Sequence, residues 1–98
     1  MSKLGSLVQK LNVIEKELKL DLTDLRLLDY AEMHWNEGRD VRVTDFVRCG
    51  AASPATVHYR IAKDLTDRKF VKLKPNPEDA REKLVLRGPK FTELEKYL

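Results

Sequence analysis

The sequence predicts a mainly helical domain with one small β-hairpin, an α+β fold. Leucines recur every three or four residues through the first third of the chain, which is typical of amphipathic helices. A Ser-Pro pair at residues 53–54 opens another helical segment, with an apolar residue at every fourth position. Further along, FVKLK and KLVLR alternate apolar and charged residues on either side of a proline-containing stretch, as the strands of a hairpin do.

Size and composition indicate one small domain. The chain has 98 residues, of which 42% are hydrophobic and 36% charged, and it contains one cysteine. We therefore expect a single domain over residues 1–98, without an intrachain disulfide, in an intracellular and cytoplasmic setting. We expect no membrane association, because no apolar run is long enough to span a bilayer and the N-terminus lacks the apolar region of a signal peptide.

Residues 1–20 are predicted to form an N-terminal helix. Its apolar residues follow the spacing of a coiled-coil seam over about two heptads, which is too short for a stable free coiled coil. The helix therefore either packs on its own domain or pairs with a second copy, as a homodimer would require. The candidate dimer-interface residues are Leu4, Leu7, Leu11, Ile14 and Leu18.

Residues 21–90 are predicted to form the core of the domain. Asp21 or Thr23 can cap the next helix, and Gly38 is a suitable stop. After it, VRV predicts a very short strand, and Thr44 is placed to cap a helix of one or two turns. Gly50 ends that helix just before the next one starts.

The helix over residues 53–67 is the most clearly marked element. Ser53 suits the N-cap and Pro54 the first helical position. Apolar residues at positions 57, 61 and 65 define the buried side. At about 100° per residue, the opposite side is small near its start and basic further on. That face carries Ala55, Thr56, Tyr59 and Lys63, with Arg60 at its margin.

Residues 70–87 are predicted to form the hairpin, and residues 90–98 a short C-terminal helix. Pro75, Asn76 and Pro77 disfavour continued strand pairing and turn the chain. A short helix, a tight turn, a second helix and a hairpin together make a winged helix-turn-helix. The second helix of such a fold fits the major groove of DNA, and the wing can place a basic side chain in the adjacent minor groove.

The charge distribution favours a polyanionic partner. Residues 39–90 carry thirteen Lys or Arg and seven Asp or Glu, a net charge of +6, although the whole chain carries only +3. We therefore expect sequence-specific binding to double-stranded DNA, by a transcriptional regulator. The alternative is a winged helix that serves as a protein–protein interaction module without DNA binding, which the modest total charge and the acidic first helices favour.

From Leu22 to about Leu98, the chain resembles MarR-type winged-helix regulators. The residues that carry the resemblance are LTDLRLLDYA, VTDFVRCGAASPATVHYRIAKDLTDRKFVKLK and, on the wing, EDAREKLVL. The resemblance implies that Asp79 braces the wing and that Arg81 enters the minor groove. Lys83, two residues further on, is also a candidate DNA-binding residue. It also implies DNA contacts at Ser53, Thr56 and Arg60.

The chain also departs from that family. The second wing strand is followed by Leu-Arg-Gly-Pro instead of the usual Leu-Thr helix cap. The terminal helices are shorter than in the family, so we expect no sizeable effector pocket. No cofactor is expected.

The sequence gives little support to catalysis or metal binding. His34, Cys49 and His58 lack the spacing of metal ligands, and no motif that orients a nucleophile surrounds the cysteine. Cys49 is expected to pack as a small apolar group. His58 lies at the edge of the buried stripe, where a structural role competes with a phosphate contact. We therefore predict a protein that is not an enzyme.

Overall fold

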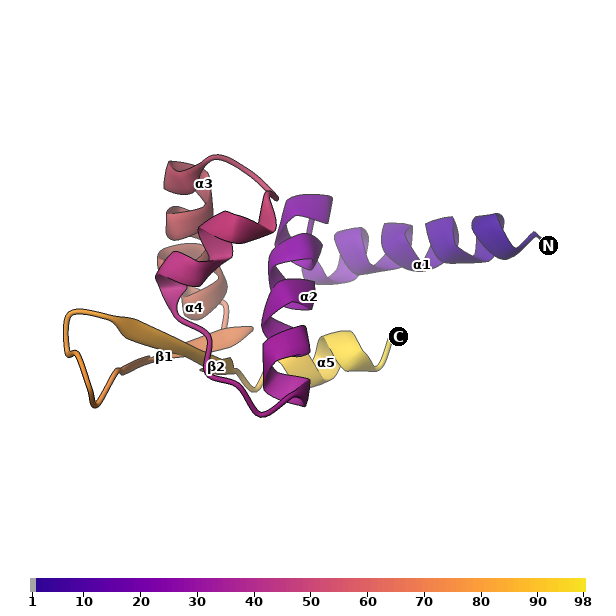
Figure 1. The fold of residues 1–98 in the computed structure, drawn as a ribbon. Helices are drawn as coiled ribbons and strands as arrows, with labels where there is room; N and C mark the ends of the chain where they lie inside the picture. The colour runs from indigo at the N-terminus through magenta and orange to yellow at the C-terminus, as the bar shows by residue number, and fades with distance from the viewer. Residues whose placement is uncertain (1) are drawn as a thin grey trace.

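The computed structural model describes residues 2–98 and packs them around one hydrophobic core (Figure 1). Its helix α1 extends away from the other elements, so that the molecule measures 50 × 25 × 24 Å. Met1 lies outside the described residues. The elements in order are α1 (Lys3–Leu18), α2 (Leu22–Asn36), the 3-10 helix η1 (Val43–Cys49), α3 (Pro54–Tyr59), the π-helix η2 (Arg60–Asp64), α4 (Leu65–Asp67), β1 (Val71–Pro75), β2 (Lys83–Arg87) and α5 (Phe91–Glu95).

Side-chain caps begin the first two helices. The Ser2 hydroxyl accepts a hydrogen bond from the Gly5 amide at 2.9 Å and starts α1. At the start of α2, Asp21 accepts from the Asp24 amide at 2.8 Å, and Asp24 accepts from the Asp21 amide at 3.2 Å. Of the two predicted caps, Asp21 is therefore the one used. The predicted stop at Gly38 is also found, since this residue has a φ of 69° just after the helix.

The predicted strand before η1 is reduced to a single bridge between Arg42 and Leu84. The predicted strand was too long because η1 begins at Val43, which leaves Arg42 alone to pair with Leu84. The expected cap at Thr44 was also wrong. Asp45 instead accepts a hydrogen bond from the Arg42 amide at 2.9 Å, which places the cap two residues earlier.

Elements α3, η2 and α4 follow one another directly and form one helical segment, the recognition helix, over residues 54–67. Its middle turn is closed by the Leu65 amide, which donates to the carbonyl of Arg60. Such a turn contains more residues than the turn of an α-helix, which has about 3.6. Residues four apart therefore stay on one side of the helix. Val57, Ile61 and Leu65 are accordingly all fully buried. The same spacing gathers the outward residues into a second row.

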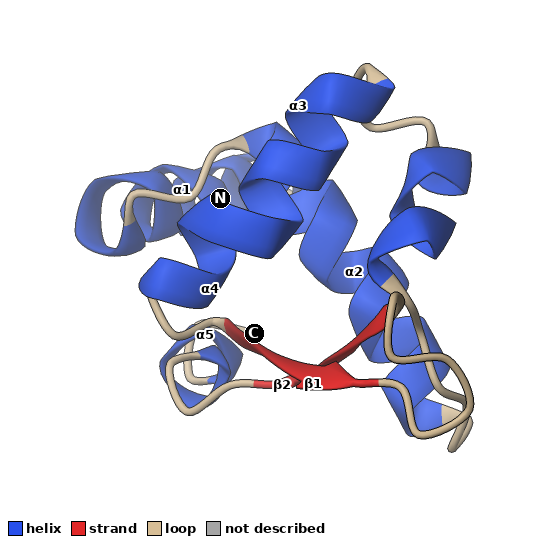
Figure 2. Ribbon diagram, turned by 90° about the vertical axis from the view of Figure 1, so that its left-hand side faces the viewer, coloured by secondary structure: helices blue, strands red, loops and turns tan. Residues whose placement is uncertain are grey.

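Strands β1 and β2 form a two-stranded antiparallel sheet in which Leu73 pairs with Val85 and Pro75 with Lys83 (Figure 2). Because side chains alternate along a strand, these residues share one face of the hairpin, and Lys74 lies on the other. The indole of Trp35 donates to the carbonyl of Val85 at 3.0 Å, which fastens the sheet to α2.

The C-terminal helix α5 is shorter than the predicted 90–98, and it closes the core beside α2. Phe91 is buried and its ring meets that of Trp35 edge to face at 5.3 Å. With η1, the turn after it, the recognition helix and the hairpin, the chain is a winged helix-turn-helix, and the predicted fold class is confirmed. Within residues 2–98, no helix combines the length and the apolar character needed to cross a membrane.

Candidate nucleic-acid interface

The outer row of the recognition helix carries the small and basic side chains that the sequence predicted. Ala55 and Tyr59 are exposed, the latter at 61%, and Lys63 follows one turn later. The ammonium group of Lys63 lies 3.0 Å from the carboxylate of Asp67. Small residues at the start of such a helix allow close approach, and the longer side chains behind them can reach a groove.

The N-terminal cap of the recognition helix is partly exposed. The Ser53 hydroxyl accepts a hydrogen bond from the Thr56 amide at 3.4 Å and donates one to the Thr56 hydroxyl at 3.1 Å. Thr56 is half-buried, so its hydroxyl lies at the edge of the outer row. Both side chains therefore lie at the start of the recognition helix, with their hydroxyls oriented by each other.

Arg60 lies on a different side of the recognition helix, facing the start of α2. Its Nη1 donates to the Asp21 carboxylate at 2.7 and 2.8 Å and to Asp24 at 3.0 Å. The hydrogen bond from Arg60 holds the pKa of Asp21 below its ordinary value. The pKa of Asp24 is raised, because burial of this carboxyl outweighs the effect of Arg60. Arg60 is thus engaged inside the domain, which the sequence did not indicate.

Arg68 extends this contact to the end of α1. Its guanidinium donates to the carbonyl oxygen of Lys19 at 2.9 Å and lies 3.4 Å from both Asp24 and Asp64. Lys19 has a φ of 57°, which is where α1 ends and the chain turns into α2. The recognition helix is therefore tied by two arginines to the corner between α1 and α2.

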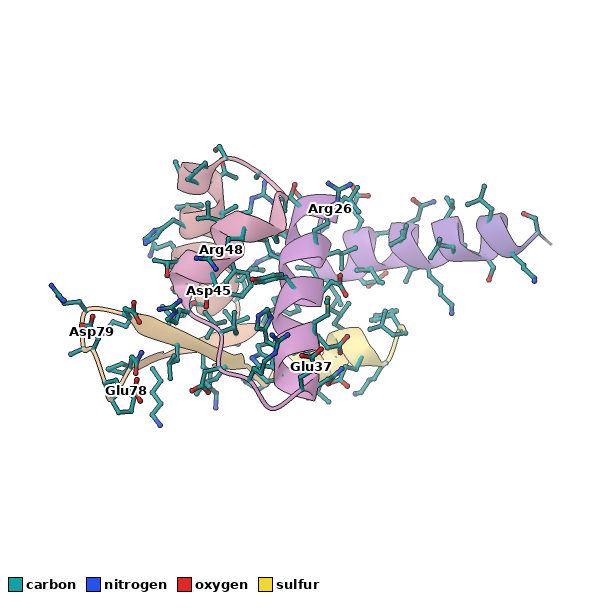
Figure 3. All side chains as sticks on the ribbon, in the orientation of Figure 1. Arg26, Glu37, Asp45, Arg48, Glu78 and Asp79 are labelled. Atoms are coloured by element: carbon teal, nitrogen blue, oxygen red, sulfur yellow. The ribbon has the colours of Figure 1, made fainter. Side chains whose placement is uncertain are left out.

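The wing presents Arg81 at its tip. Both the backbone amide and the guanidinium of Arg81 donate to the carboxylate of Asp79, at 3.0 and 3.2 Å, and the Arg81 side chain is 92% exposed. These two hydrogen bonds hold the pKa of the Asp79 carboxyl below its ordinary value. Figure 3 shows Asp79 and Glu78 side by side at the turn of the hairpin. Lys83 follows, exposed, at the start of β2.

A network behind the tip braces the wing, and sequence reasoning missed it. Arg42 donates to Asp45 at 3.0 Å and to Glu82 at 3.1 Å, and Asn76 donates to Glu82 at 3.2 Å. The amide of Glu78 also donates to the Asn76 side chain, at 3.0 Å. Asn-Pro is a local signal for such a turn. The pairing of Arg42 with Glu82, forty residues apart, has no signal in a single sequence.

The predicted seam on α1 is divided between the core and the surface. Ile14 and Leu18 are buried against the domain, and Leu11 is half-buried. Leu4 and Leu7 are 70% and 53% exposed on the part of α1 that extends outward (Figure 1). An apolar hollow of about 210 Å³ lies beside the seam, between α1, α2 and α5.

The candidate metal ligands named from the sequence do not form a metal site within the described residues. Among residues 2–98, no three His, Cys, Asp or Glu side chains are grouped so that they could hold a metal ion. Cys49 is half-buried and packs against the core at the end of η1. His58 is exposed on the recognition helix, on the side that faces the wing.

Comparison with known proteins supports the fold. No family model matches the chain, and no curated protein does. Among solved structures, it is similar to BpsR of Bordetella bronchiseptica, from work on the regulation of DNA binding by 6-hydroxynicotinic acid. The two share 21% sequence identity with a TM-score of 0.62, over 93% of this chain and 64% of BpsR. The chain thus spans somewhat less than two thirds of that protein, and at this identity the similarity establishes the fold alone.

Proposed function

We propose that the chain is a sequence-specific, double-stranded DNA-binding transcriptional regulator of the MarR-like kind. The recognition helix enters the major groove, and the wing, residues 70–87, lies at the adjacent minor groove. One observation carries this proposal: the exposed Arg81 of the wing lies beside the recognition helix, because Arg81 lines one hollow with His58 and Ala62 of that helix. The similarity in fold to BpsR, whose DNA binding is regulated, supports it.

Each outward side chain of the recognition helix has a distinct role in this arrangement. Ala55 lets the backbone approach the base edges, and the Ser53 and Thr56 hydroxyls bind bases or phosphates at the start of the helix. Tyr59 and Lys63 reach further along the groove. Arg60 acts indirectly, because its contacts with Asp21 and Asp24 fix the orientation of the recognition helix relative to α2.

Arg81 suits a minor groove because its side chain is extended and almost fully exposed. A narrow A·T-rich minor groove has an enhanced negative potential that attracts arginine. Asp79 holds the wing turn by accepting a hydrogen bond from the backbone amide of Arg81. The guanidinium of Arg81 can therefore rotate toward DNA without loss of that hydrogen bond.

A homodimer would place two such domains on one DNA duplex. The exposed Leu4 and Leu7 of α1 provide an apolar surface for a second copy. Two recognition helices related by a two-fold axis would contact half-sites about one helical turn of DNA apart. The proposal therefore includes a palindromic binding site.

Selection of bound duplexes from a random pool tests the function directly. The expected result is an enriched palindrome with A·T pairs next to each half-site. Binding of the selected duplex should weaken steeply with salt, through counterion release. The Arg81→Ala variant should lose the preference for the A·T pairs. Absence of binding at low salt, or binding that salt leaves unchanged, would contradict the proposal.

A protein-interaction module is the second candidate, and an acidic hollow favours it. The hollow, of about 650 Å³, lies between the wing and the segment before η1. Its lining includes the carboxylates of Asp40, Asp45, Glu78, Asp79 and Glu82. Asp45 and Glu82 are paired with Arg42, and Asp79 is paired with Arg81. Carboxylates beside a wing repel DNA and attract a basic protein surface. The same salt titration separates the two candidates.

A further inference from the structure

A second hollow lies between the recognition helix and the wing, on the side opposite the acidic one. Its volume is about 210 Å³, and the start of η1 closes one end. Ala62 and Leu73 provide an apolar floor, and polar side chains stand around them. These polar side chains are Thr44, His58, Arg81 and Lys83, together with the paired Arg42 and Glu82.

The balance of charge in this hollow favours an anion. Among the side chains that line the hollow, Arg42, Arg81 and Lys83 are cationic and Glu82 is the one carboxylate. Arg42 pairs with Glu82 at 3.1 Å and with Asp45, which lies outside the lining. Arg81 is bound to Asp79, outside the hollow, by its Nε. Lys83 takes part in no ion pair with any of the residues 2–98, and it is exposed at the mouth. The hollow therefore presents an ammonium group without an ion-pair partner among residues 2–98, with a hydroxyl and an imidazole beside it as hydrogen-bonding groups.

The position of the hollow identifies the anion. A major and a minor groove of duplex DNA are separated by one sugar-phosphate strand. When the recognition helix occupies one groove and the wing the next, the surface between the two elements must face that strand. The hollow lies on this surface, because the recognition helix and β1–β2 form its walls.

We propose that this hollow binds one phosphodiester of the DNA strand between the two grooves, with Lys83, His58 and Thr44 as its ligands. The inference rests on the proposed function and adds two contacts, Thr44 and His58, that position DNA without reading bases. Lys83 supplies the charge, and the Thr44 hydroxyl and one ring nitrogen of His58 donate hydrogen bonds. The apolar floor accommodates the sugar.

The test uses the full chain and a selected duplex with a neutral methylphosphonate at one backbone position at a time. At one position near the junction of the two grooves, the methylphosphonate should weaken binding of the wild-type protein about two- to tenfold. In Lys83→Gln, the same substitution should cost much less, because the positive partner is already absent and only the hydrogen bonds of Thr44 and His58 remain to be lost. The slope of log affinity against log salt should also fall by about 0.9 in this variant.

Lys74→Gln is the matched control, because Lys74 is also exposed on the same hairpin but lies on its other face. This variant should retain the full methylphosphonate effect at that position. Thr44→Val should reduce the effect without changing the salt slope, since it removes no charge. His58→Gln should also reduce the effect.

The outcomes separate the two proposals. If the wild-type protein binds DNA with a steep salt dependence, but Lys83→Gln and Lys74→Gln show the same methylphosphonate effect, the phosphate site is wrong and the proposed function stands. If the wild-type protein binds no duplex, both are overturned.

Discussion

Arg60 and Asp24 connect the recognition helix to the start of α2, with 3.0 Å between Nη1 and Oδ1. The Asp24 side chain is 4% exposed and that of Arg60 is 27% exposed. Asp24 also accepts the Asp21 amide, so one carboxylate caps a helix and holds a second helix against it. A carboxylate that is so little exposed depends on its partners, because the cost of removing it from water must be offset.

Arg60→Ala should therefore lower the free energy of unfolding by about 1–3 kcal/mol, since Arg68 remains as a partial partner for Asp24. Urea denaturation of the purified variant measures this change. Lys63→Ala is the comparison: its exposed pair with Asp67 should contribute little to stability, although Lys63 is proposed to contact DNA. If Arg60→Ala unfolds at the wild-type urea midpoint but loses base discrimination, Arg60 contacts DNA and does not stabilise the domain.

The wing provides a prediction about pH. Asp79 has a pKa below the ordinary 3.8 because the guanidinium and the amide of Arg81 donate to its carboxylate. A carboxyl with a lowered pKa in the folded state stabilises that state at pH values above 3.8. The stabilisation is lost as the pH falls through the folded-state pKa. We expect Arg81→Gln to shift the carboxyl titration of Asp79, followed by NMR, upward toward 3.8.

The comparison for this titration is Lys83→Gln, which leaves the pair of Asp79 and Arg81 intact and should leave the midpoint where it is in the wild-type protein. An identical Asp79 midpoint in Arg81→Gln and the wild type would show that the ion pair does not persist in solution.

Local signals in the sequence predicted most of the fold. Ser53 and Asp21 mark helix starts because a cap needs only a side-chain oxygen and the amides three residues further on. The buried row of the recognition helix follows from spacing alone. Alternation predicted both strands, and the prolines between them predicted the turn. Each of these features involves residues that are near one another in the chain.

Contacts between distant residues could not be predicted. Arg60 was placed at the margin of the outer face by its position on an ideal α-helix, and among the DNA contacts by the family resemblance. Its pairing with the Asp21 and Asp24 carboxylates, 39 and 36 residues away, has no local signal. The brace between Arg42 and Glu82 was missed for the same reason. A single sequence shows which residues are charged but not which of them pair across the domain.

Gly88 makes a close approach that no other residue can replace. A Cβ at this position would lie 2.7 Å from the carbonyl carbon of Phe70 and 2.8 Å from the amide nitrogen of Val71. These are backbone atoms, so they cannot move aside as a side-chain end can. Gly88→Ala should therefore destabilise the domain by about 1–3 kcal/mol, measured by urea denaturation.

Gly38→Asn is the comparison, since nothing lies within 4 Å there and asparagine tolerates the positive φ. Equal midpoints for Gly88→Ala and the wild type would contradict the close approach.

The division of the α1 seam gives a test of dimer formation. Leu7 is 53% exposed, whereas Ile14 is 1% exposed in the core of the same chain. Leu7→Asp should therefore abolish self-association without unfolding the monomer, while Ile14→Asp should unfold it. Light scattering of the eluted protein at several concentrations measures the mass. Gln9→Asp, at another exposed position outside the seam, should leave the mass at that of the wild type.

On the selected palindrome, Leu7→Asp should bind each half-site independently, because the link between the two recognition helices is lost. A wild-type protein that is monomeric at every concentration, or a Leu7→Asp protein with an unchanged dimer mass, would show that the exposed end of α1 does not join two copies.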